Sequence, residues 1–600
     1  MESTSSKHNF LGYFNFFYKV LGIKFVITLM LSVGVSFLDG IGLAMFIPLL
    51  QSMSETGQPS ADQSQSMGKL SFLTEMFEKF SIPLNIYSVL TMLVVLFVAK
   101  GMLKFVELYC QVGLKQTFIR TIRFGLTDDL QNLSYKGFLN QNAGKIQNVI
   151  TSEVQKLQSS LTHYLNSTSS VGMLLTYVAM AFMANWQFAI LVAVGAMVMN
   201  LFFSRMVRSV KTASFKISSK GDIFTAYLIE AVHYFKYLKA TNQFAGFTRK
   251  LKKVINQTEG LNRKVGHYQA ITASIREPIV MIIVVLVIVI QIRFLGGNLG
   301  SIMLSLLLFY RALSFLMNFQ NSWQNFIQNV GAIESVSKLK AEMKSHREVQ
   351  KDREFGGLKA RLDLHNLTFK YGEHTVINDV TMHIPKNHTI AFVGESGSGK
   401  TTLANIITGI LEPNGGYISL DGVKVTEYNM DSFRSSIGYI SQEPVIFKDD
   451  VFNNVTFWSE RTPENIARFW EVIELASLTD FIRKMPEKES TSLGDKGMLI
   501  SGGQKQRISI ARELFKKSEI LILDEATSAL DSETELYIQR NIEKLQGNYT
   551  LIIIAHRLST IKKADQIYML ENGKINSHGT FDELTELSPK FKRMVSLQQI

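Results

Sequence analysis

A stretch rich in glycine and hydroxyl side chains has the composition of a phosphate-binding loop. It consists of Gly394, Glu395, Ser396, Gly397, Ser398, Gly399, Lys400, Thr401 and Thr402. The strand-like sequence TIAFV precedes it, and the helix-like sequence LANIITGIL follows it. Glycine lets successive backbone N–H groups point at phosphate oxygens, and a helix N-terminus favours negative charge. We therefore expect a nucleotide site in which Lys400 reaches the terminal phosphates and Thr401 ligates Mg²⁺.

A pair of carboxylates further along the chain supplies the other chemistry that nucleotide hydrolysis needs. Asp524 and Glu525 follow the apolar sequence ILIL, which is typical of a buried strand. Hydrolysis requires one carboxylate near Mg²⁺ and another beside the attacking water. We assign Asp524 to the metal and Glu525 to the water, as general base. A surface acidic pair after a core strand is the alternative, and the phosphate-binding loop upstream argues against it.

The elements that must position these residues belong to an α/β domain. From Leu362 onwards the sequence changes to short alternating strands, LDLHNLTF and then TVINDVTMHI. We expect this nucleotide-binding domain to cover residues 358–600. A linker at residues 346–357 would join it to a different kind of domain at residues 1–345.

Residues 1–345 hold most of the apolar surplus of the chain. The 600 residues are 46% hydrophobic and 19% charged, whereas a typical soluble domain has roughly 25% charged residues. Six segments approach or exceed the length that crosses a bilayer as a helix, at residues 22–50, 86–106, 171–184, 188–203, 279–295 and 302–317. The predicted fold class is a multi-domain membrane protein, with an all-α six-helix transmembrane domain followed by an α/β P-loop NTPase domain. The single cysteine, Cys110, excludes an intrachain disulfide or a zinc site built on several thiolates.

The distribution of charge predicts the orientation in the membrane. Residues 205–264 carry thirteen Lys or Arg against three Asp or Glu, whereas residues 51–83 carry two against four. Because basic loops remain in the cytoplasm, we expect a multi-pass protein with both termini and the nucleotide-binding domain in the cytoplasm. The fusion of one membrane domain to one nucleotide-binding domain is compatible with a bacterial inner membrane, and an organellar membrane is the alternative. The net charge of +12 then belongs beside the anionic headgroups of the lipid bilayer, and no nucleic acid partner is needed.

Two polar segments between the spans are compatible with helices. They cover residues 116–161 and 205–265. If the spans continue into these segments, each pair of helices forms a hairpin whose tip can contact the nucleotide-binding domain. We expect the tips near residues 134–141 and 221–225.

The sequence ISGGQ, with Ser501, Gly502, Gly503 and Gln504, lies about twenty residues before Asp524. It resembles the signature motif of the ATP-binding cassette (ABC) transporters, although Ile500 stands where the family usually has Leu. The other motifs of that family appear in order, as Tyr371, Gln442, Asp531 in the D-loop and His556. Six spans ahead of one cassette resemble an exporter-type half-transporter.

The resemblance implies roles for these residues. Tyr371 would stack on adenine, His556 would contact the γ-phosphate, and Gln442 would reach both the metal and the membrane domain. Each ATP would lie between the phosphate-binding loop of one cassette and the signature of another, so a second half-transporter is needed. Since Glu525 is present, two competent sites in a homodimer are our preferred interpretation.

Charged residues within the spans point to the substrate, because a charge in a bilayer is costly unless it has a function or a partner. Lys100, Lys104 and Arg311 suit an amphiphile with a phosphate or pyrophosphate head. The alternative is that the lysines extend to the headgroups, and that Asp39 pairs with Arg311 or with a lysine. The segment at residues 37–49 looks like the first span of bacterial exporters of lipids or lipid-linked oligosaccharides.

The expected function is therefore ATP-driven export or flipping of an amphipathic substrate, a lipid or a lipid-linked saccharide, by alternating access. A multidrug or peptide exporter is the alternative. An ATP-gated channel or a channel regulator is a further one.

Overall fold

The computed structural model describes residues 10–46, 49, 83, 85–184, 186–294, 299–524, 540, 542–555 and 561–598. The chain divides into two compact units. The first comprises Met1–Leu133 and Gly137–Arg347, and the second comprises Ser134–Lys136 and Glu348–Ile600.

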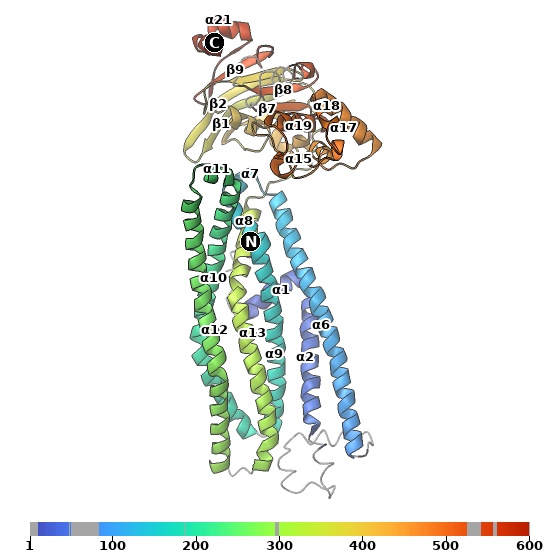
Figure 1. Ribbon diagram of the computed structural model, residues 1–600, viewed down its shortest axis with the longest axis vertical. Coiled ribbons are helices and arrows are strands. Elements are labelled where there is room, and N and C mark those ends of the chain that lie inside the picture. Colours follow the sequence, from blue (N-terminus) through green and yellow to red (C-terminus); the bar gives the residue numbers. More distant parts are fainter. Residues whose placement is uncertain are drawn as a thin grey trace. The chain divides into compact units, whose positions relative to one another are not determined.

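The described chain before residue 346 is helical (Figure 1). Its elements are α1 (Phe10–Leu21), α2 (Ile23–Ala44), α6 (Ile86–Gln131), α7 (Tyr135–Leu139), α8 (Ala143–Asn148), the π-helical turn η2 (Val149–Glu153), α9 (Val154–Ala184), α10 (Trp186–His233), α11 (Phe235–Ala240), α12 (Phe244–Phe294) and α13 (Leu299–Ser345). Within the described residues, three helices are long and apolar enough to cross a membrane, at Ile23–Ala44, Ile86–Gln131 and Phe244–Ile290.

An aromatic cluster joins five of these helices. Phe17 of α1, Phe25 of α2, Phe118 of α6, Tyr164 of α9 and Phe326 of α13 are fully buried. The ring centroids of Phe17 and Tyr164 lie 5.2 Å apart, and those of Tyr164 and Phe326 lie 5.6 Å apart. Edge and tilted ring contacts at such distances add to the gain from burying apolar area. The cluster therefore fixes α1 against the bundle.

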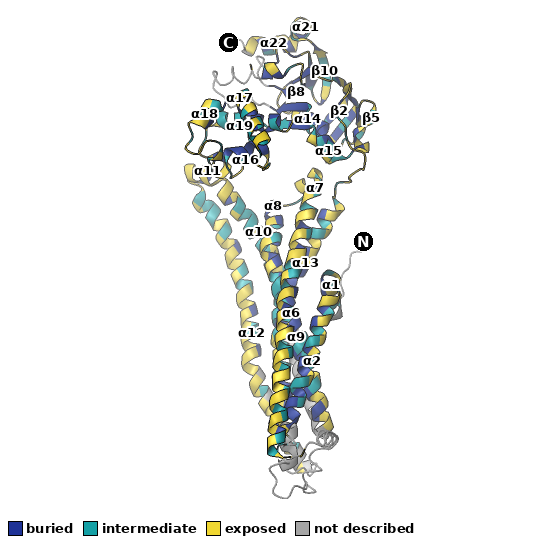
Figure 2. Cartoon of the chain, turned by 90° about the vertical axis from the view of Figure 1, so that its right-hand side faces the viewer, coloured by how far each residue is buried: buried dark blue, intermediate teal, exposed yellow. Residues whose placement is uncertain are grey.

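Helices α6 and α12 carry large apolar side chains that are exposed, and Figure 2 shows much of α12 as exposed. These side chains include Val94, Val98, Met102 and Phe105 on α6, and Met281, Ile282, Val285 and Val289 on α12. Apolar faces of this extent need lipid or another protein surface to cover them.

The structure confirms the position of the first hairpin and corrects that of the second. The chain turns between α6 and α8, where residues 134–141 were expected to form a tip. The predicted turn at residues 221–225 is wrong, because α10 continues through them to His233 and the chain turns around α11. Gly221 serves close packing instead. A Cβ atom on Gly221 would lie 3.2 Å from the Asn148 side-chain nitrogen.

The second unit has the α/β composition predicted from its sequence (Figure 1). Its strands are β1 (Arg361–Tyr371), β2 (His374–Pro385), β3 (Thr389–Val393), β4 (Gly415–Leu420), β5 (Val423–Lys424), β6 (Ile437–Ile440), β7 (Ile520–Asp524), β8 (Thr550–Ile554), β9 (Gln566–Glu571) and β10 (Lys574–Gly579). Its α-helices are α14 (Lys400–Ile407), α15 (Met430–Ser435), α16 (Val451–Thr456), α17 (Pro463–Leu475), α18 (Thr479–Arg483), α19 (Gly502–Phe515), α21 (Phe581–Leu587) and α22 (Pro589–Gln598). Short 3₁₀ turns lie at Val425–Glu427, Lys488–Ser490 and Asp495–Gly497.

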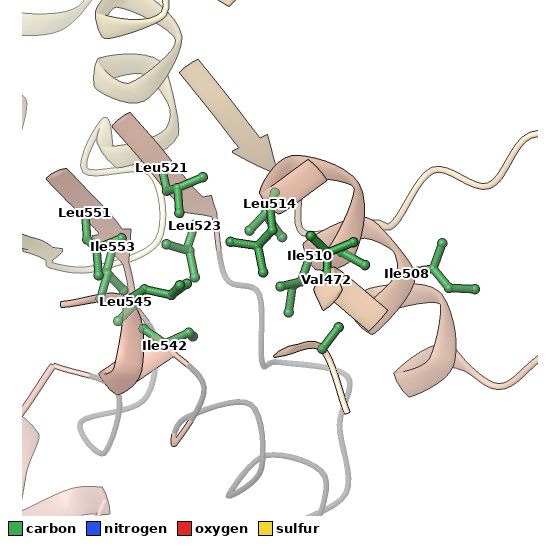
Figure 3. Close-up of a cluster of buried hydrophobic side chains, with 14 of the residues drawn as sticks. Val472, Ile508, Ile510, Leu514, Leu521, Leu523, Ile542, Leu545, Leu551 and Ile553 are labelled. Atoms are coloured by element: carbon green, nitrogen blue, oxygen red, sulfur yellow. The ribbon is translucent and has the colours of Figure 1, made fainter. Parts of the chain in front are cut away.

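The strands of this unit form two sheets. The smaller one is antiparallel, in the order β2-β1-β4-β5. The larger one has the order β10-β9-β3-β8-β7-β6 and is parallel from β9 to β6. Strands β3, β7 and β8 are buried along their whole length, as is usual for apolar strands with both faces covered. Leu521, Leu523, Leu551 and Ile553 of β7 and β8 belong to the same buried cluster as Ile510 of α19 (Figure 3).

Candidate nucleotide site

The phosphate-binding loop follows β3 and leads into α14, as the sequence predicts. Gly394 and Gly399 have φ angles of 149° and 102°, which are unfavourable for residues with a side chain. A Cβ on Gly394 would lie 2.2 Å from the Leu570 carbonyl oxygen, so only glycine lets the loop pass this close to β9. The hydroxyl of Ser398 is buried and has no hydrogen-bond partner among the described residues. The loop therefore has the tight backbone, and an available buried hydroxyl, that phosphate oxygens require.

Lys400 lies across this loop. Its side chain is 5% exposed, and its Nζ donates to the carbonyl oxygens of Gly394 at 2.9 Å and Glu395 at 3.0 Å. The two bonds hold the ammonium group among the loop residues. Its charge is thus placed where phosphate groups would enter the loop.

Two hydroxyl groups hold the carboxylate of Asp524. Thr401 Oγ1 donates to Asp524 Oδ1 at 3.4 Å, and the Tyr439 hydroxyl donates to Asp524 Oδ2 at 2.9 Å. Burial, then the charge of Asp524 and this hydrogen bond, raise the pKa of Tyr439, so its hydroxyl keeps its proton and acts as donor. A carboxylate beside a threonine hydroxyl is a set of hard oxygen ligands that suits Mg²⁺.

The parallel sheet gathers most of the predicted site residues at one edge. Strands β3, β8, β7 and β6 have their carboxyl ends on the same side, and ligands of open parallel sheets bind at that edge. The phosphate-binding loop follows β3, Asp524 ends β7, and the exposed Gln442 follows β6. Glu525, Asp531 and His556 lie outside the described residues.

Tyr371 is placed by a different sheet. It ends β1, is 46% exposed, and packs against the edge of Phe369 with ring centroids 4.9 Å apart. An exposed aromatic face supported from one side suits stacking on a planar base. This geometry is compatible with the adenine contact that the resemblance implies.

The predicted signature lies at the start of α19. Ser501 is the N-cap residue, and its hydroxyl accepts the N–H of Gln504 at 3.3 Å. The side chain of Gln504 in return accepts the N–H of Ser501 at 2.8 Å, which completes a capping box. Ser501 and Gly502 are exposed, and Gly502 and Gly503 are the first two residues of α19. The helix start therefore presents backbone N–H groups and a hydroxyl to the surface.

Arg512 ties the signature helix to the segment after Gln442. It is 4% exposed, and its guanidinium donates to the carbonyl oxygens of Asn454 at 2.6 Å and Val445 at 2.8 Å. The Asn454 side chain also bonds the backbone of Phe447. Since α19 carries the signature, the two predicted nucleotide-contact regions belong to one hydrogen-bonded block.

Two of the three cations proposed from the sequence to contact the substrate, Lys100 and Lys104, have acidic partners. Lys100 of α6 forms an ion pair with Asp39 of α2, and the Tyr177 hydroxyl of α9 donates to the other oxygen of Asp39 at 2.7 Å. Lys104 forms an ion pair at 2.7 Å with the fully buried Glu107. The sequence suggested that Lys100, Lys104 and Arg311 could bind an anionic substrate. Because Lys100 and Lys104 have acidic partners in the chain, Arg311 is the cation of this group that remains a candidate.

Sequence reasoning missed Tyr439, Glu107 and Arg512. Tyr439 lies three residues before Gln442, within a strand, and only strand pairing reveals that it reaches Asp524. A glutamate close to the end of an apolar segment was the signal available for Glu107.

Residues 377–528 match the family described as ABC transporter, and residues 25–325 match the ABC transporter transmembrane region. "Heterocyst differentiation ATP-binding protein HepA" of Nostoc is 33% identical over 484 residues, which are 78% of this chain and 77% of that protein. The "ATP-dependent lipid A-core flippase" of Salmonella typhimurium is 31% identical over 511 residues, which are 82% of this chain and 84% of that protein.

A solved structure gives the same fold. The structure of a bacterial Atm1-family ABC exporter with ATP bound matches with a TM-score of 0.79 at 19% sequence identity. The match covers 97% of this chain and 100% of that chain. At this identity the likeness concerns the fold.

Proposed function

Because the chain belongs to the ABC transporter family, with the membrane region and the cassette of an exporter fused in one polypeptide, we propose that it moves a lipid or lipid-linked saccharide with an anionic head across a membrane. It is an integral multi-pass membrane protein and an ATP-hydrolysing exporter. As a half-transporter it acts as a dimer. The proposal adds that the dimer is a homodimer and that the membrane is a bacterial inner membrane, with the cassette in the cytoplasm.

The proposed division of the chain follows its composition. Residues 1–345 form the membrane domain, residues 346–357 a linker, and residues 358–600 the cassette. Helix α13 ends at Ser345 and strand β1 begins at Arg361, which supports these bounds.

The proposed roles in hydrolysis combine the geometry of the described loop with the sequence motifs. Lys400 and the loop at residues 394–402 bind the phosphates, Tyr371 stacks on the base, and Asp524 with Thr401 holds Mg²⁺. Mg²⁺, when bound, neutralises charge on the phosphate oxygens. Glu525 accepts a proton from the attacking water, and Gln442, Asp531 and His556 complete the site.

The exposed helix start at Ser501 supports a site shared between two cassettes. Its N–H groups and hydroxyl face outward, where the γ-phosphate held by a second chain can accept their hydrogen bonds. ATP would then hold two cassettes together, and hydrolysis would remove the charge that joins them.

The proposal that the substrate has an anionic head rests on Arg311. It is exposed, lies twelve residues after the start of α13 at Leu299, and has no acidic partner within ion-pair distance among the described residues. An unneutralised cation in an apolar helix is costly unless it has a function. The relatives named as lipid A-core flippases support a lipid substrate.

Reconstitution tests this proposal. The purified full-length chain in proteoliposomes should hydrolyse ATP faster with phosphate-bearing lipids or lipid-linked saccharides than with neutral drugs or peptides. Arg311→Gln should weaken this stimulation by about tenfold or more, whereas Arg293→Gln, at the exposed end of α12, serves as the matched control. Unchanged rates with anionic lipids and faster rates with neutral drugs would favour the multidrug alternative. Ion flux far exceeding the ATP hydrolysed would favour a channel.

A further inference from the structure

Tyr439 has no role in the motifs of the cassette, yet its hydroxyl contacts a predicted metal ligand. The hydroxyl donates to Asp524 Oδ2 at 2.9 Å, and Thr401 approaches the other oxygen, Oδ1, at 3.4 Å. The Asp524 side chain is thus held from both ends of its carboxylate. Asp524 is 5% exposed, so little water competes for these bonds.

The strand register explains why Tyr439 reaches this position. Strands β6 and β7 are parallel neighbours, in which Tyr439 pairs with Ile522. Side chains two residues apart on a strand share a face, so Asp524 lies on the same face as Ile522 and one step further along. The ring of Tyr439 packs against the buried cluster of this sheet. Both the backbone and the ring therefore fix the direction of the hydroxyl.

The orientation of a metal-binding carboxylate depends on groups that bond it from outside the metal. The terminal torsion of an aspartate is broad, so an unsupported carboxylate samples many orientations. Hydrogen bonds from such outer residues typically contribute 10-fold to 100-fold to metal affinity or activity. A donor on Oδ2 leaves Oδ1, the oxygen beside Thr401, directed at the place where Mg²⁺ is proposed to bind.

We propose that Tyr439 is a positioning residue that orients Asp524 for Mg²⁺ bound with the nucleotide. This inference rests on the proposed assignment of Asp524 to the metal. The hydroxyl, and not the ring, carries the effect. Tyr439→Phe therefore isolates it, because phenylalanine keeps the packing and removes the donor.

The chain offers a matched control. Tyr568 of β9 belongs to the same large sheet, is buried, and donates its hydroxyl to the His383 carbonyl oxygen at 3.3 Å, away from Asp524. Tyr568→Phe removes a hydroxyl from the same sheet and leaves the hydrogen bonds to the Asp524 carboxylate in place. Asp524→Asn tests the assignment of the metal ligand itself.

The experiment uses Mn²⁺ as a spectroscopic probe for the Mg²⁺ site. Electron paramagnetic resonance would measure Mn²⁺ binding to the full-length protein in detergent with a non-hydrolysable ATP analogue. We expect Tyr439→Phe to weaken Mn²⁺ binding by about tenfold, with Tyr568→Phe unchanged and metal-free binding of the analogue unchanged in both. The Mg²⁺ concentration that gives half-maximal ATPase activity should rise in parallel, with turnover recovered at high Mg²⁺.

The outcomes separate the two proposals. Wild-type Mn²⁺ affinity in Tyr439→Phe, with binding lost in Asp524→Asn, would overturn the role of Tyr439 and leave the metal assignment in place. Wild-type Mn²⁺ affinity in Asp524→Asn would overturn the metal assignment. If Tyr439→Phe also loses metal-free nucleotide binding and melts well below Tyr568→Phe, Tyr439 has a packing role only, and the inference fails.

Discussion

The ion pair between Asp39 and Lys100 gives the sharpest test of the helical unit. It joins α2 to α6, and Tyr177 of α9 adds a hydrogen bond to the same carboxylate. Asp39→Asn removes the negative charge, while the asparagine oxygen can still accept the bond from Tyr177. Lys100 then remains as a charge in an apolar segment without its partner.

The expected cost follows from the environment of Lys100. A lysine at the centre of a membrane helix costs about 2.5–3.5 kcal/mol. The Lys100 side chain is 28% exposed, and its flexible stem can carry the ammonium towards polar surroundings, which lowers the cost to about 2 kcal/mol. Asp39→Asn should therefore lower the melting temperature by about 4 °C. The double variant Asp39→Asn with Lys100→Met removes both charges and should melt close to the wild type.

Thermal unfolding of the four proteins in one detergent forms a double-mutant cycle. The double variant costs little, so the coupling between the two positions equals the summed cost of the two single variants and should exceed about 2 kcal/mol, because each single variant leaves one charge unpaired. Additive effects, with the double variant the least stable of all, would refute the view that the two residues neutralise each other. A control at Lys24, near the start of α2, should change the melting temperature by less than either single variant.

Further predictions concern the cassette and the helical hairpins. Glu525→Gln should bind ATP but release phosphate 10²-fold to 10⁴-fold more slowly, and near-wild-type turnover would contradict the general-base assignment. Lys400→Ala should weaken ATP binding, measured by titration of a fluorescent nucleotide, since it removes the cation in the loop. Burial raises the pKa of Asp222 above 3.8, and the charge of Glu153 raises it further. The hydrogen bond from Asn148 lowers this pKa but does not cancel the rise. The folded state then binds this proton more tightly than the unfolded state, so stability falls as pH rises from 3.8 through the folded pKa. In Asp222→Asn the melting temperature should fall less over this pH range than in the wild type. An equal fall in the two proteins would contradict the role of Asp222.

The sequence predicts the elements around the phosphate-binding loop correctly because they are contiguous in the chain. A loop of defined residues between a strand and a helix is specified locally, and β3, the loop and α14 occur where expected. The apolar strand before Asp524 is likewise a local signal. The turn of the second hairpin is different, because it was expected at residues 221–225, where α10 continues and Gly221 allows a close approach of Asn148. Whether a glycine lies in a turn or at a close helix contact depends on segments that are distant in sequence.

For the charges of the helical unit the sequence left two interpretations open, and the structure shows the one in which Asp39 pairs with a lysine. Lys100 and Asp39 are 61 residues apart in sequence, and no periodicity reveals that they pair. Tyr439 was missed because its contact depends on the register of two strands separated by about 80 residues. Residue type and spacing thus predict which groups can do chemistry, whereas pairing across the fold decides which of them remain available.

The buried guanidinium of Arg512 has a consequence for cooperativity. It joins the helix that begins at the signature to the backbone at Val445 and Asn454, after Gln442. In the proposed dimer, the first region contacts the nucleotide of the partner and the second contacts the chain's own nucleotide. A rigid connection between them makes occupancy of one site favour the geometry of the other, so ATP should bind with a Hill coefficient above one. Such a machine would respond to ATP as a threshold, remaining idle until both nucleotides are present.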